Sequence, residues 1–418
     1  MINLKSRVDR TLLLTLVFYC SLILNILLGW LLAKLNTQFL TVSDYGKYSF
    51  FLIAVYFSRI FFSFGVSESS SRLIAVNDSD SEQKNLIGVG LIWILFFIVP
   101  YGFFFFLSPD LFDHFFQVNI GAINKYFSFA VGLILIHAYL NLALRGHGRI
   151  ILLSFNTIAP RTFYIILLII IINYNTFTLT HTLEMFFIGL MFSILLVVII
   201  VKPNFQDFKS KSQKLWTEIK SYGIHLYISN IWHEILFHSD KFIISYYLDD
   251  KAMAYYALGY MITYPLSHFS TSLSTTLFNK FISQKKIRSR DLKVNSIYVF
   301  VTVSVIILLR KIIIIHLFSE KYLATIDLIL PLAIAFGLSG LSKPFNMFLM
   351  AHGYGQVVRN ISILVSSLHI VLNIVFVPKF GITGAAWIAT LIYGLDLLLF
   401  YLFYHRMVRI ADSQHRIS

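Results

Sequence analysis

Long apolar segments recur along the whole chain, and they limit its fold more than any other feature. Each runs for about 20 residues, the length of a helix that crosses a bilayer, without the alternation that a β-barrel strand would need. Only 13% of the residues are charged and 57% are hydrophobic, whereas soluble domains carry about 25% charged residues. Because lipid offers the backbone no hydrogen-bond partner, these segments must be helices. The sequence therefore predicts an all-α integral membrane protein.

The chain has room for about twelve transmembrane helices. Their predicted ranges are 11–40, 48–66, 86–107, 121–144, 151–173, 182–201, 223–247, 255–278, 294–318, 326–349, 357–377 and 384–405. The first range follows Lys5, Arg7 and Arg10 as a signal peptide would, but it exceeds the usual apolar core of about 7–15 residues. We therefore expect it to be a retained helix.

The loops between the predicted helices differ strongly in positive charge. The formal net charge is +14, which in a soluble protein would point to nucleic acid. If the N-terminus is cytoplasmic, 22 Lys and Arg residues fall on the cytoplasmic side and 5 on the opposite side. Cytoplasmic loops of membrane proteins carry such an excess. We therefore expect two cytoplasmic termini, an even number of spans and no nucleic acid partner.

A polar, basic loop from Lys202 to Ser221 divides the chain near its middle. An offset of 207 residues pairs Lys34 with Lys241 and Gly146 with Gly353, which favours an internal duplication. Six helices return the chain to its starting side, so the halves would be parallel repeats, as in many transporters. The predicted organisation is an N-terminal six-helix lobe (1–205), a cytoplasmic basic linker (206–220), a C-terminal six-helix lobe (221–405) and a cytoplasmic tail (406–418).

Basic and acidic side chains also lie inside the predicted spans, where each would cost about 2.5–3.5 kcal/mol if it faced lipid at mid-depth. The basic ones are Lys34, Arg59, Arg161, Lys241, Arg310, Lys311 and Lys343, and the acidic ones are Glu234, Asp240 and Asp396. Pairing alone leaves several cations unmatched. A central water-filled cavity lined by such cations would suit an anion, because Arg and Lys both bind phosphate.

We expect the anion to be bound by Arg59, Arg161, Lys241 and Lys34, with Arg310 and Lys311 as further candidates. The alternative for each is a structural role, either in a pair with an acid or with the side chain extended to the headgroups. Arg59 is poorly placed for such extension, because it lies near the middle of its span.

The predicted seventh span carries the most polar side chains. Glu234, His238 and Lys241 are spaced to share one helix face, and Asp240 lies roughly 120° away. A carboxylate beside a histidine in a membrane can carry a proton or hold a cation. Glu234, His238 and Asp240, together with Asp396, are therefore candidates for ion coupling; mutual neutralisation within the helix is the alternative.

No motif of an enzyme or a metal site stands out. His233 and His238 are five residues apart rather than the four of a zinc-protease motif, and the single cysteine, Cys20, allows no Cys-based metal site. The Gly-x-Gly loops at 145–149 and 352–355 follow no strand, so they predict tight turns between helices and not nucleotide cradles. We expect no catalytic residue, no metal and no cofactor besides a proton or sodium gradient.

Four segments carry a family likeness. They are Leu372–Thr390, which contains Pro378-Lys379-Phe380-Gly381, then Tyr45–Tyr48, Phe64–Ala75 and Asp240–Ala257. Together they resemble the polysaccharide exporters and O-antigen flippases of the multidrug/oligosaccharidyl-lipid/polysaccharide transporter superfamily. The likeness extends along the whole chain, and its most specific part is the segment 372–390.

The resemblance implies a protein of the bacterial inner membrane with a V-shaped, two-lobed fold. It also implies a substrate, an undecaprenyl-diphosphate-linked oligosaccharide such as the O-antigen repeat unit of lipopolysaccharide, which would be flipped by alternating access driven by an ion gradient. A diphosphate agrees with the excess of cations. The expected partners are this substrate and membrane lipid, with other polysaccharide assembly proteins as further candidates.

Two other functions remain open at this stage. A membrane polymerase or ligase of the same pathway would carry a large outer loop with catalytic basic residues, and no loop of that size lies on the predicted outer side. A drug/cation antiporter of the same superfamily would favour acids over bases in its cavity, whereas bases prevail here.

Overall fold

The computed structural model describes residues 2–172 and 177–414. Within them the chain is helical and contains no strand. Its contacts divide it into two compact units, unit 1 (Met1–His238) and unit 2 (Ser239–Ser418). Each unit is described below by itself.

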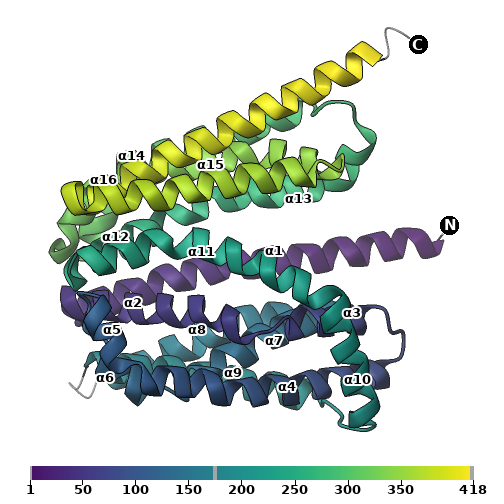
Figure 1. The fold of residues 1–418 in the computed structure, drawn as a ribbon, viewed down its shortest axis with the longest axis horizontal. Helices are drawn as coiled ribbons and strands as arrows, with labels where there is room; N and C mark the ends of the chain where they lie inside the picture. Colours follow the sequence, from purple (N-terminus) through teal and green to yellow (C-terminus); the bar gives the residue numbers. More distant parts are fainter. Residues whose placement is uncertain (1, 173–176, 415–418) are drawn as a thin grey trace. The chain divides into compact units, whose positions relative to one another are not determined.

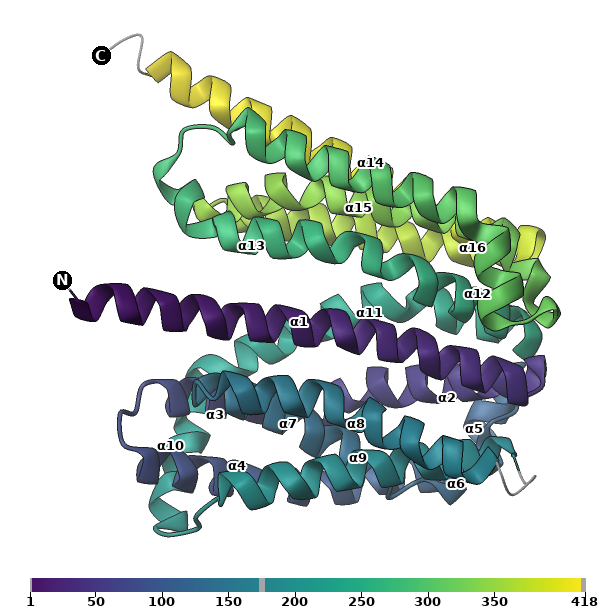
Figure 2. The same cartoon turned by 180° about the vertical axis from the view of Figure 1, so that it is seen from behind.

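Unit 1 begins with ten α-helices, one short 3-10 segment (η1) and one short π-helical segment (η2). They are α1 (Ile2–Phe39), α2 (Val42–Ser58), η1 (Arg59–Phe62), α3 (Val66–Ala75), α4 (Asp80–Leu107), α5 (Pro109–Phe115), α6 (Gly121–Tyr126), α7 (Gly132–Gly146), α8 (Ile150–Ile172), α9 (Leu179–Val201), α10 (Phe208–Glu218) and η2 (Ile219–Gly223). α8 packs on α1 and α9, and α7 packs on α3 and α4 (Figures 1 and 2). α11 (Ile224–Tyr247) continues from unit 1 into unit 2.

Unit 2 is arranged around one central helix. Its elements are α12 (Asp250–Thr263), η3 (Tyr264–Ser267), α13 (His268–Ser283), α14 (Ser289–Ile312), η4 (Ile313–Phe318), η5 (Glu320–Thr325), α15 (Ile326–Ala351) and α16 (Gly355–Gln414). α15 packs against α12, α13, α14 and α16, so it has the most neighbours of the described helices in this unit (Figure 1).

The beginnings of several helices carry a side chain that caps the free backbone N–H groups. Thr41 Oγ1 accepts from Asp44 N at 3.1 Å, Thr178 Oγ1 from His181 N at 3.2 Å, and Asp249 Oδ1 from Ala252 N at 2.8 Å. Such caps satisfy donors that have no partner within the helix. They fix where α2, α9 and α12 begin.

Residues with positive φ mark the turns at which several helices end. Between η1 and α3 the chain bends by 66°, and Phe64 and Gly65 have φ of 45° and 72° there. Gly381 (φ 60°, ψ −152°) breaks α16 into two helices, at the place predicted between the last two spans. Gly148 and Gly353 also have positive φ, which confirms tight turns in the two Gly-x-Gly loops.

Two predicted spans prove to be broken helices. The range 121–144 contains α6, a turn and α7, and the range 255–278 contains parts of α12 and α13 joined by η3. In the second case Pro265 explains the break, because proline lacks the N–H that would continue the hydrogen-bond ladder. The apolar pattern could not locate these interruptions, since both sides of each break are apolar.

Seven of the described helices are long and apolar enough to cross a membrane, and the bent pair around Gly65 would be an eighth. Helix occupies at least part of every range predicted as a span. Large apolar side chains such as Phe96, Leu308 and Phe300 are 70%, 79% and 74% exposed, as expected for surfaces that face lipid. The chain is a multi-pass membrane protein; twelve spans stay a prediction.

The division into compact units falls inside α11, between His238 and Ser239, and the predicted linker at 206–220 stays a prediction. The first half of α11 belongs to unit 1, because Tyr227 donates to the carbonyl of Phe61 at 3.1 Å and Asn230 donates to Glu68 at 2.9 Å. The two lobes were predicted from a repeat in the sequence, and this internal duplication stays a prediction.

Candidate functional site

A cluster of charged side chains in unit 1 joins the end of α2 to α11. Arg59 Nη2 lies 3.9 Å from Glu234 Oε1, and the other oxygen of Glu234 lies 3.2 Å from His238 Nε2. The second contact confirms that Glu234 and His238 share one helix face. The side chains of Arg59, Glu234 and His238 are only partly exposed, at 30%, 22% and 14%. Arg59 is held in place because its Nε donates to the carbonyl of Tyr56 at 3.1 Å.

Glu68 on α3 adds a carboxylate that the sequence analysis missed. Its Oε1 accepts from Asn230 Nδ2 at 2.9 Å, whereas Oε2 is buried with no hydrogen-bond partner among the described residues. The charge of Arg59 also acts on this carboxylate. Glu68 follows the turn at Phe64 and Gly65, just outside the predicted span, so a search confined to spans could not include it.

Arg161 lies on α8, one residue after Pro160, and points toward α1. Its Nη1 donates to the carbonyl of Asn25. Gly29 leaves room for the guanidinium, because a Cβ there would lie 2.7 Å from Nη1 and 3.2 Å from Cζ. Among the described residues, no carboxylate forms an ion pair with Arg161.

Tyr56 on α2 lies within electrostatic range of both arginines. The charges of Arg59 and Arg161 both act on its hydroxyl, and Arg59 Cζ lies 5.6 Å from its ring centroid. Tyr48, two turns earlier on α2, also interacts with the charge of Arg161. The structure thus brings the two predicted anion-binding arginines to one region of unit 1, together with tyrosine hydroxyls.

A neutral polar group lies close by in unit 1, on α7 and α8. His137 Nε2 lies 3.0 Å from the carbonyl oxygen of Asn156, and Asn156 Nδ2 donates to Asn141 Oδ1 at 3.0 Å. The charge of Arg59 reaches His137. Amides and histidines resemble ordinary packing residues in an apolar sequence, so no pattern of charged residues marks these three positions.

Lys241 and Asp240 form a buried pair in unit 2. Lys241 Nζ lies 3.0 Å from Asp240 Oδ1, Tyr256 donates to Asp240 Oδ2 at 2.7 Å, and both charged residues are only 3% exposed. Lys241 Nζ also lies 3.7 Å from the ring centroid of Tyr260, as in a cation–π interaction. This arrangement corresponds to the alternative in which charges of the seventh predicted span neutralise each other.

The other predicted site residues are spread over separate places. Arg310 and Lys311 occupy the last turn of α14, where a helix favours positive charge, and Lys311 is exposed. Lys34 is half-buried on α1. Asp396 on α16 faces Ser342 and Lys343 of α15. Within the described part of the chain, no three His, Cys, Asp or Glu side chains gather as metal ligands would.

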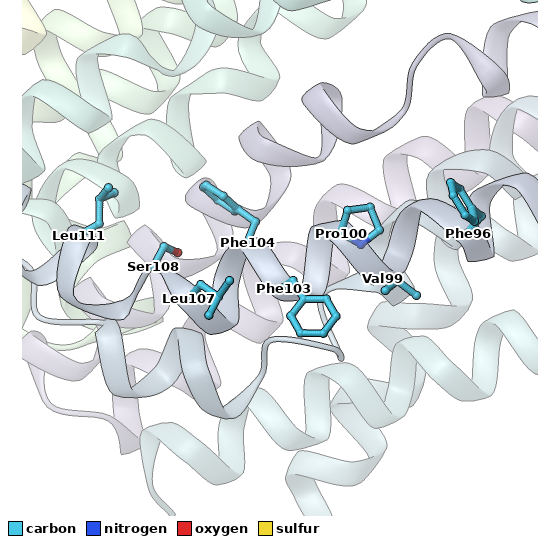
Figure 3. A pocket seen from close by; sticks show the side chains of 8 residues that line it. All are labelled: Phe96, Val99, Pro100, Phe103, Phe104, Leu107, Ser108 and Leu111. Carbon is cyan, nitrogen blue, oxygen red and sulfur yellow. The ribbon is translucent and has the colours of Figure 1, made fainter.

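One groove in unit 1, on α4 and α5, is apolar and is lined by none of these charged groups (Figure 3). It has a volume of about 800 Å³, and its lining residues are Phe96, Val99, Pro100, Phe103, Phe104, Leu107, Ser108 and Leu111. Such a surface suits alkyl chains of a lipid and offers a phosphate no charged partner among its lining residues.

Comparisons with known proteins agree with this architecture. The family model described as "Polysaccharide biosynthesis protein" matches residues 14–283. No curated protein matches the chain. An inward-facing multidrug resistance transporter of the MATE family, within the MOP superfamily, superposes with a TM-score of 0.76 at 14% identity, covering 93% of this chain and 96% of the other.

Two further solved structures share the fold. The lipid II flippase MurJ in an inward closed conformation has a TM-score of 0.70 at 16% identity, over 93% of this chain and 87% of its own. A MOP superfamily transporter from Pyrococcus furiosus is described as having a binding pocket of reverse polarity. It has a TM-score of 0.62 at 14% identity, covering 95% of this chain and 94% of its own. The chain therefore belongs to the polysaccharide biosynthesis protein family and has the fold of MOP superfamily transporters.

Proposed function

We propose that this protein is a transporter that flips an undecaprenyl-diphosphate-linked oligosaccharide, of the O-antigen repeat-unit type, from the cytoplasmic to the outer leaflet. It would act by alternating access in the bacterial inner membrane, with both termini in the cytoplasm, and would make or break no covalent bond. The observation that carries the proposal is Arg161, a guanidinium with no carboxylate partner among the described residues, in the same region of unit 1 as Arg59.

The proposed substrate supplies the negative charge for which Arg161 has no carboxylate partner among the described residues. A diphosphate offers several oxygens in the geometry that an arginine recognises with two parallel N–H groups. Arg161 is the primary phosphate ligand in this proposal, and Arg59 is the second. Tyr48 and Tyr56, with the amides of Asn141 and Asn156, are of the type that hydrogen-bonds to sugar hydroxyls.

Lys34, Arg310 and Lys311 take a secondary part in the proposal. They could attract the diphosphate before it reaches Arg161, because unpaired positive charges raise the local concentration of anions. Lys241 is less suited to bind substrate, since Asp240 and Tyr260 already engage its ammonium.

The contact between Arg59 and Glu234 offers a way to couple substrate to an ion gradient. At 3.9 Å this pair is loose, so a phosphate could draw Arg59 away. Glu234, still beside His238, would then be a carboxylate without its arginine and could take up a proton or a sodium ion. Glu68 extends this acidic site, whereas Asp240 is neutralised by Lys241, and Asp396 interacts with Lys343.

The decisive experiment removes the gene and follows the lipid-linked oligosaccharide. We expect the oligosaccharide to accumulate on the cytoplasmic leaflet, and we expect complementation by the wild type but not by Arg161→Ala. Lys379→Ala, which removes a positive charge from an exposed position on α16, is the matched control and should complement. Normal appearance of the oligosaccharide outside, in a strain without a second such gene, would refute the proposal.

The fold also suits the two alternative functions, and each has its own assay. The likeness to multidrug transporters favours a drug/cation antiporter, which would confer drug efflux that persists in Arg161→Ala. A polymerase or ligase would extend lipid-linked sugars when purified protein is given them. We expect neither activity.

A further inference from the structure

We propose that α10 lies in the plane of the membrane surface and binds the headgroups of anionic phospholipids through its outward face. That face is formed by Lys209, Gln213 and Trp216 of α10 and continues to Lys220 of η2. The inference concerns the segment between α9 and α11, and it does not depend on which substrate the protein carries.

One side of α10 is fastened to unit 1, which sets its rotation. Lys211 pairs with Glu82 of α4, and Trp93 Nε1 donates to Ser212 Oγ at 2.8 Å. Leu215 is 1% exposed. Beyond Leu215 in sequence, Glu218 Oε1 accepts from Arg72 Nη1 at 2.8 Å. The helix therefore cannot turn freely, and the side opposite Leu215 is turned outward. On that side the Trp216 ring stacks on Trp93 of α4, with 5.8 Å between ring centroids, and still remains exposed.

The outward face combines basic and aromatic side chains. Lys209, Gln213, Trp216 and Lys220 are spaced by four, three and four residues, so they lie on one side. All four are exposed, and Lys220 Nζ lies 4.8 Å from the ring centroid of Trp216. A tryptophan with lysines around it is typical of the boundary between headgroups and acyl chains.

The position of α10 along the chain places it at that boundary. α9 ends at Val201, and the preceding Ile199 and Ile200 are 63% and 52% exposed, as lipid-facing residues are. Lys202 follows directly, and Asn204 N donates to the carbonyl of Lys84, near the start of α4. Hence α10 begins within a few residues of the point where two spanning helices leave the hydrocarbon.

Aromatic side chains near the start of α10 extend the apolar part of this surface. Phe205 and Phe208 are 51% and 39% exposed, and Trp216 is 45% exposed. In water these side chains would be exposed at a cost, whereas at the interface they enter the acyl boundary while the lysines stay among the headgroups. A soluble partner would explain the charges but not their continuity with the lipid-facing end of α9.

The charge balance of the surface favours an anionic lipid. Lys211 and Glu218 already have partners, which leaves Lys202, Lys209, Lys214 and Lys220 against Asp207 alone. Each lysine near an anionic membrane surface favours binding by about fivefold. Loss of two outward lysines should therefore lower the preference for anionic lipid on the order of 25-fold.

The test measures which lipid lies against α10. Full-length protein carrying Cys20→Ser and Gln213→Cys is labelled with a fluorophore at position 213 and reconstituted in phosphatidylcholine vesicles. Spin-labelled phosphatidylglycerol or spin-labelled phosphatidylcholine is then added as quencher. We expect stronger quenching by phosphatidylglycerol, and a preference that declines as salt is raised, because salt screens exposed charges.

Two pairs of substitutions make the test specific. Lys209→Gln with Lys220→Gln should lower the preference on the order of 25-fold. Lys285→Gln with Lys286→Gln removes the same charge from an exposed loop of unit 2 and should preserve it. Equal quenching by both lipids would overturn the proposal. Absence of quenching by either lipid would also overturn it, since α10 would then face water and a soluble partner would become the better explanation.

Discussion

The position of the Arg161 guanidinium requires glycine at position 29. The guanidinium occupies the space beside Gly29 and bonds to the carbonyl of Asn25 on α1. In Gly29→Ala the new methyl group would lie 2.7 Å from Nη1, so the guanidinium must move and that hydrogen bond must weaken. Since hydrogen bonds of charged groups contribute about 1.5–3 kcal/mol, we expect flipping to fall by about tenfold or more.

The thermal stability of Gly29→Ala shows whether flipping falls because Arg161 has moved or because the fold is damaged. Alanine favours a helix by about 1 kcal/mol over glycine, so Gly29→Ala should insert and melt like the wild type. Gly355→Ala is the matched control, because a Cβ there would meet nothing within 4 Å. Equal flipping rates in both variants and the wild type would show that Arg161 does not need its observed position.

Lys241 differs from Arg161 in that its positive charge is already paired with a carboxylate, that of Asp240. In Asp240→Asn the buried ammonium would lose its charge partner, so we expect the free energy of unfolding to fall by about 3–5 kcal/mol. The double variant Asp240→Asn with Lys241→Met should recover most of the loss, since no buried charge remains. Thermal unfolding of the purified proteins in detergent measures both, and an unchanged melting temperature in the single variant would contradict the pairing.

These residues show which part of the charged site the sequence could predict. The i, i+4 spacing was enough to place Glu234 beside His238, because helix geometry fixes such pairs. It could not show that Lys241 turns to its own neighbour Asp240, since a long flexible side chain can reach several places around a helix. Nor could it find Glu68, whose approach to Asn230 depends on how α3 packs against α11.

At the scale of helices, apolar length predicted where helices lie and turn chemistry decided where they break. The pattern of Leu372–Thr390 placed a junction between two predicted spans, and Gly381 occupies it with φ 60° and ψ −152°. The breaks near 127–131 and Pro265 were not predicted. They lie within continuous apolar sequence, where hydropathy carries no information about backbone direction.

Gly381 should be intolerant of any side chain. Its backbone conformation is essentially restricted to glycine, and a Cβ there costs about 1–3 kcal/mol even though no atom lies within 4 Å of it. We expect Gly381→Ala to lower the melting temperature, whereas Gly394→Ala, whose Cβ would make an ordinary 3.7 Å contact with Leu338, should not. Identical melting of the two variants would argue against the observed break in α16.

For the whole molecule, composition and charge distribution predicted the membrane class and a direction of insertion. They could not predict that compact units divide inside α11, because this depends on contacts such as that of Tyr227 with the carbonyl of Phe61. The asymmetry of positive charge nevertheless predicts the orientation of the chain in the membrane, which local packing does not. It assigns every loop to one of two sides, so a single inverted loop would contradict the scheme.

Two exposed positions in unit 2 test that assignment. Ser283 ends α13 in a basic loop predicted to be cytoplasmic, and Ala324 lies in η5, beside a loop predicted to be outside. In a Cys20→Ser background, a membrane-impermeant maleimide should label Ala324→Cys in intact cells and Ser283→Cys only after the inner membrane is opened. The excess of Lys and Arg fixes orientation during insertion. The reverse labelling pattern would therefore mean that these basic residues have another role, and that substrate would approach unit 2 from the opposite side.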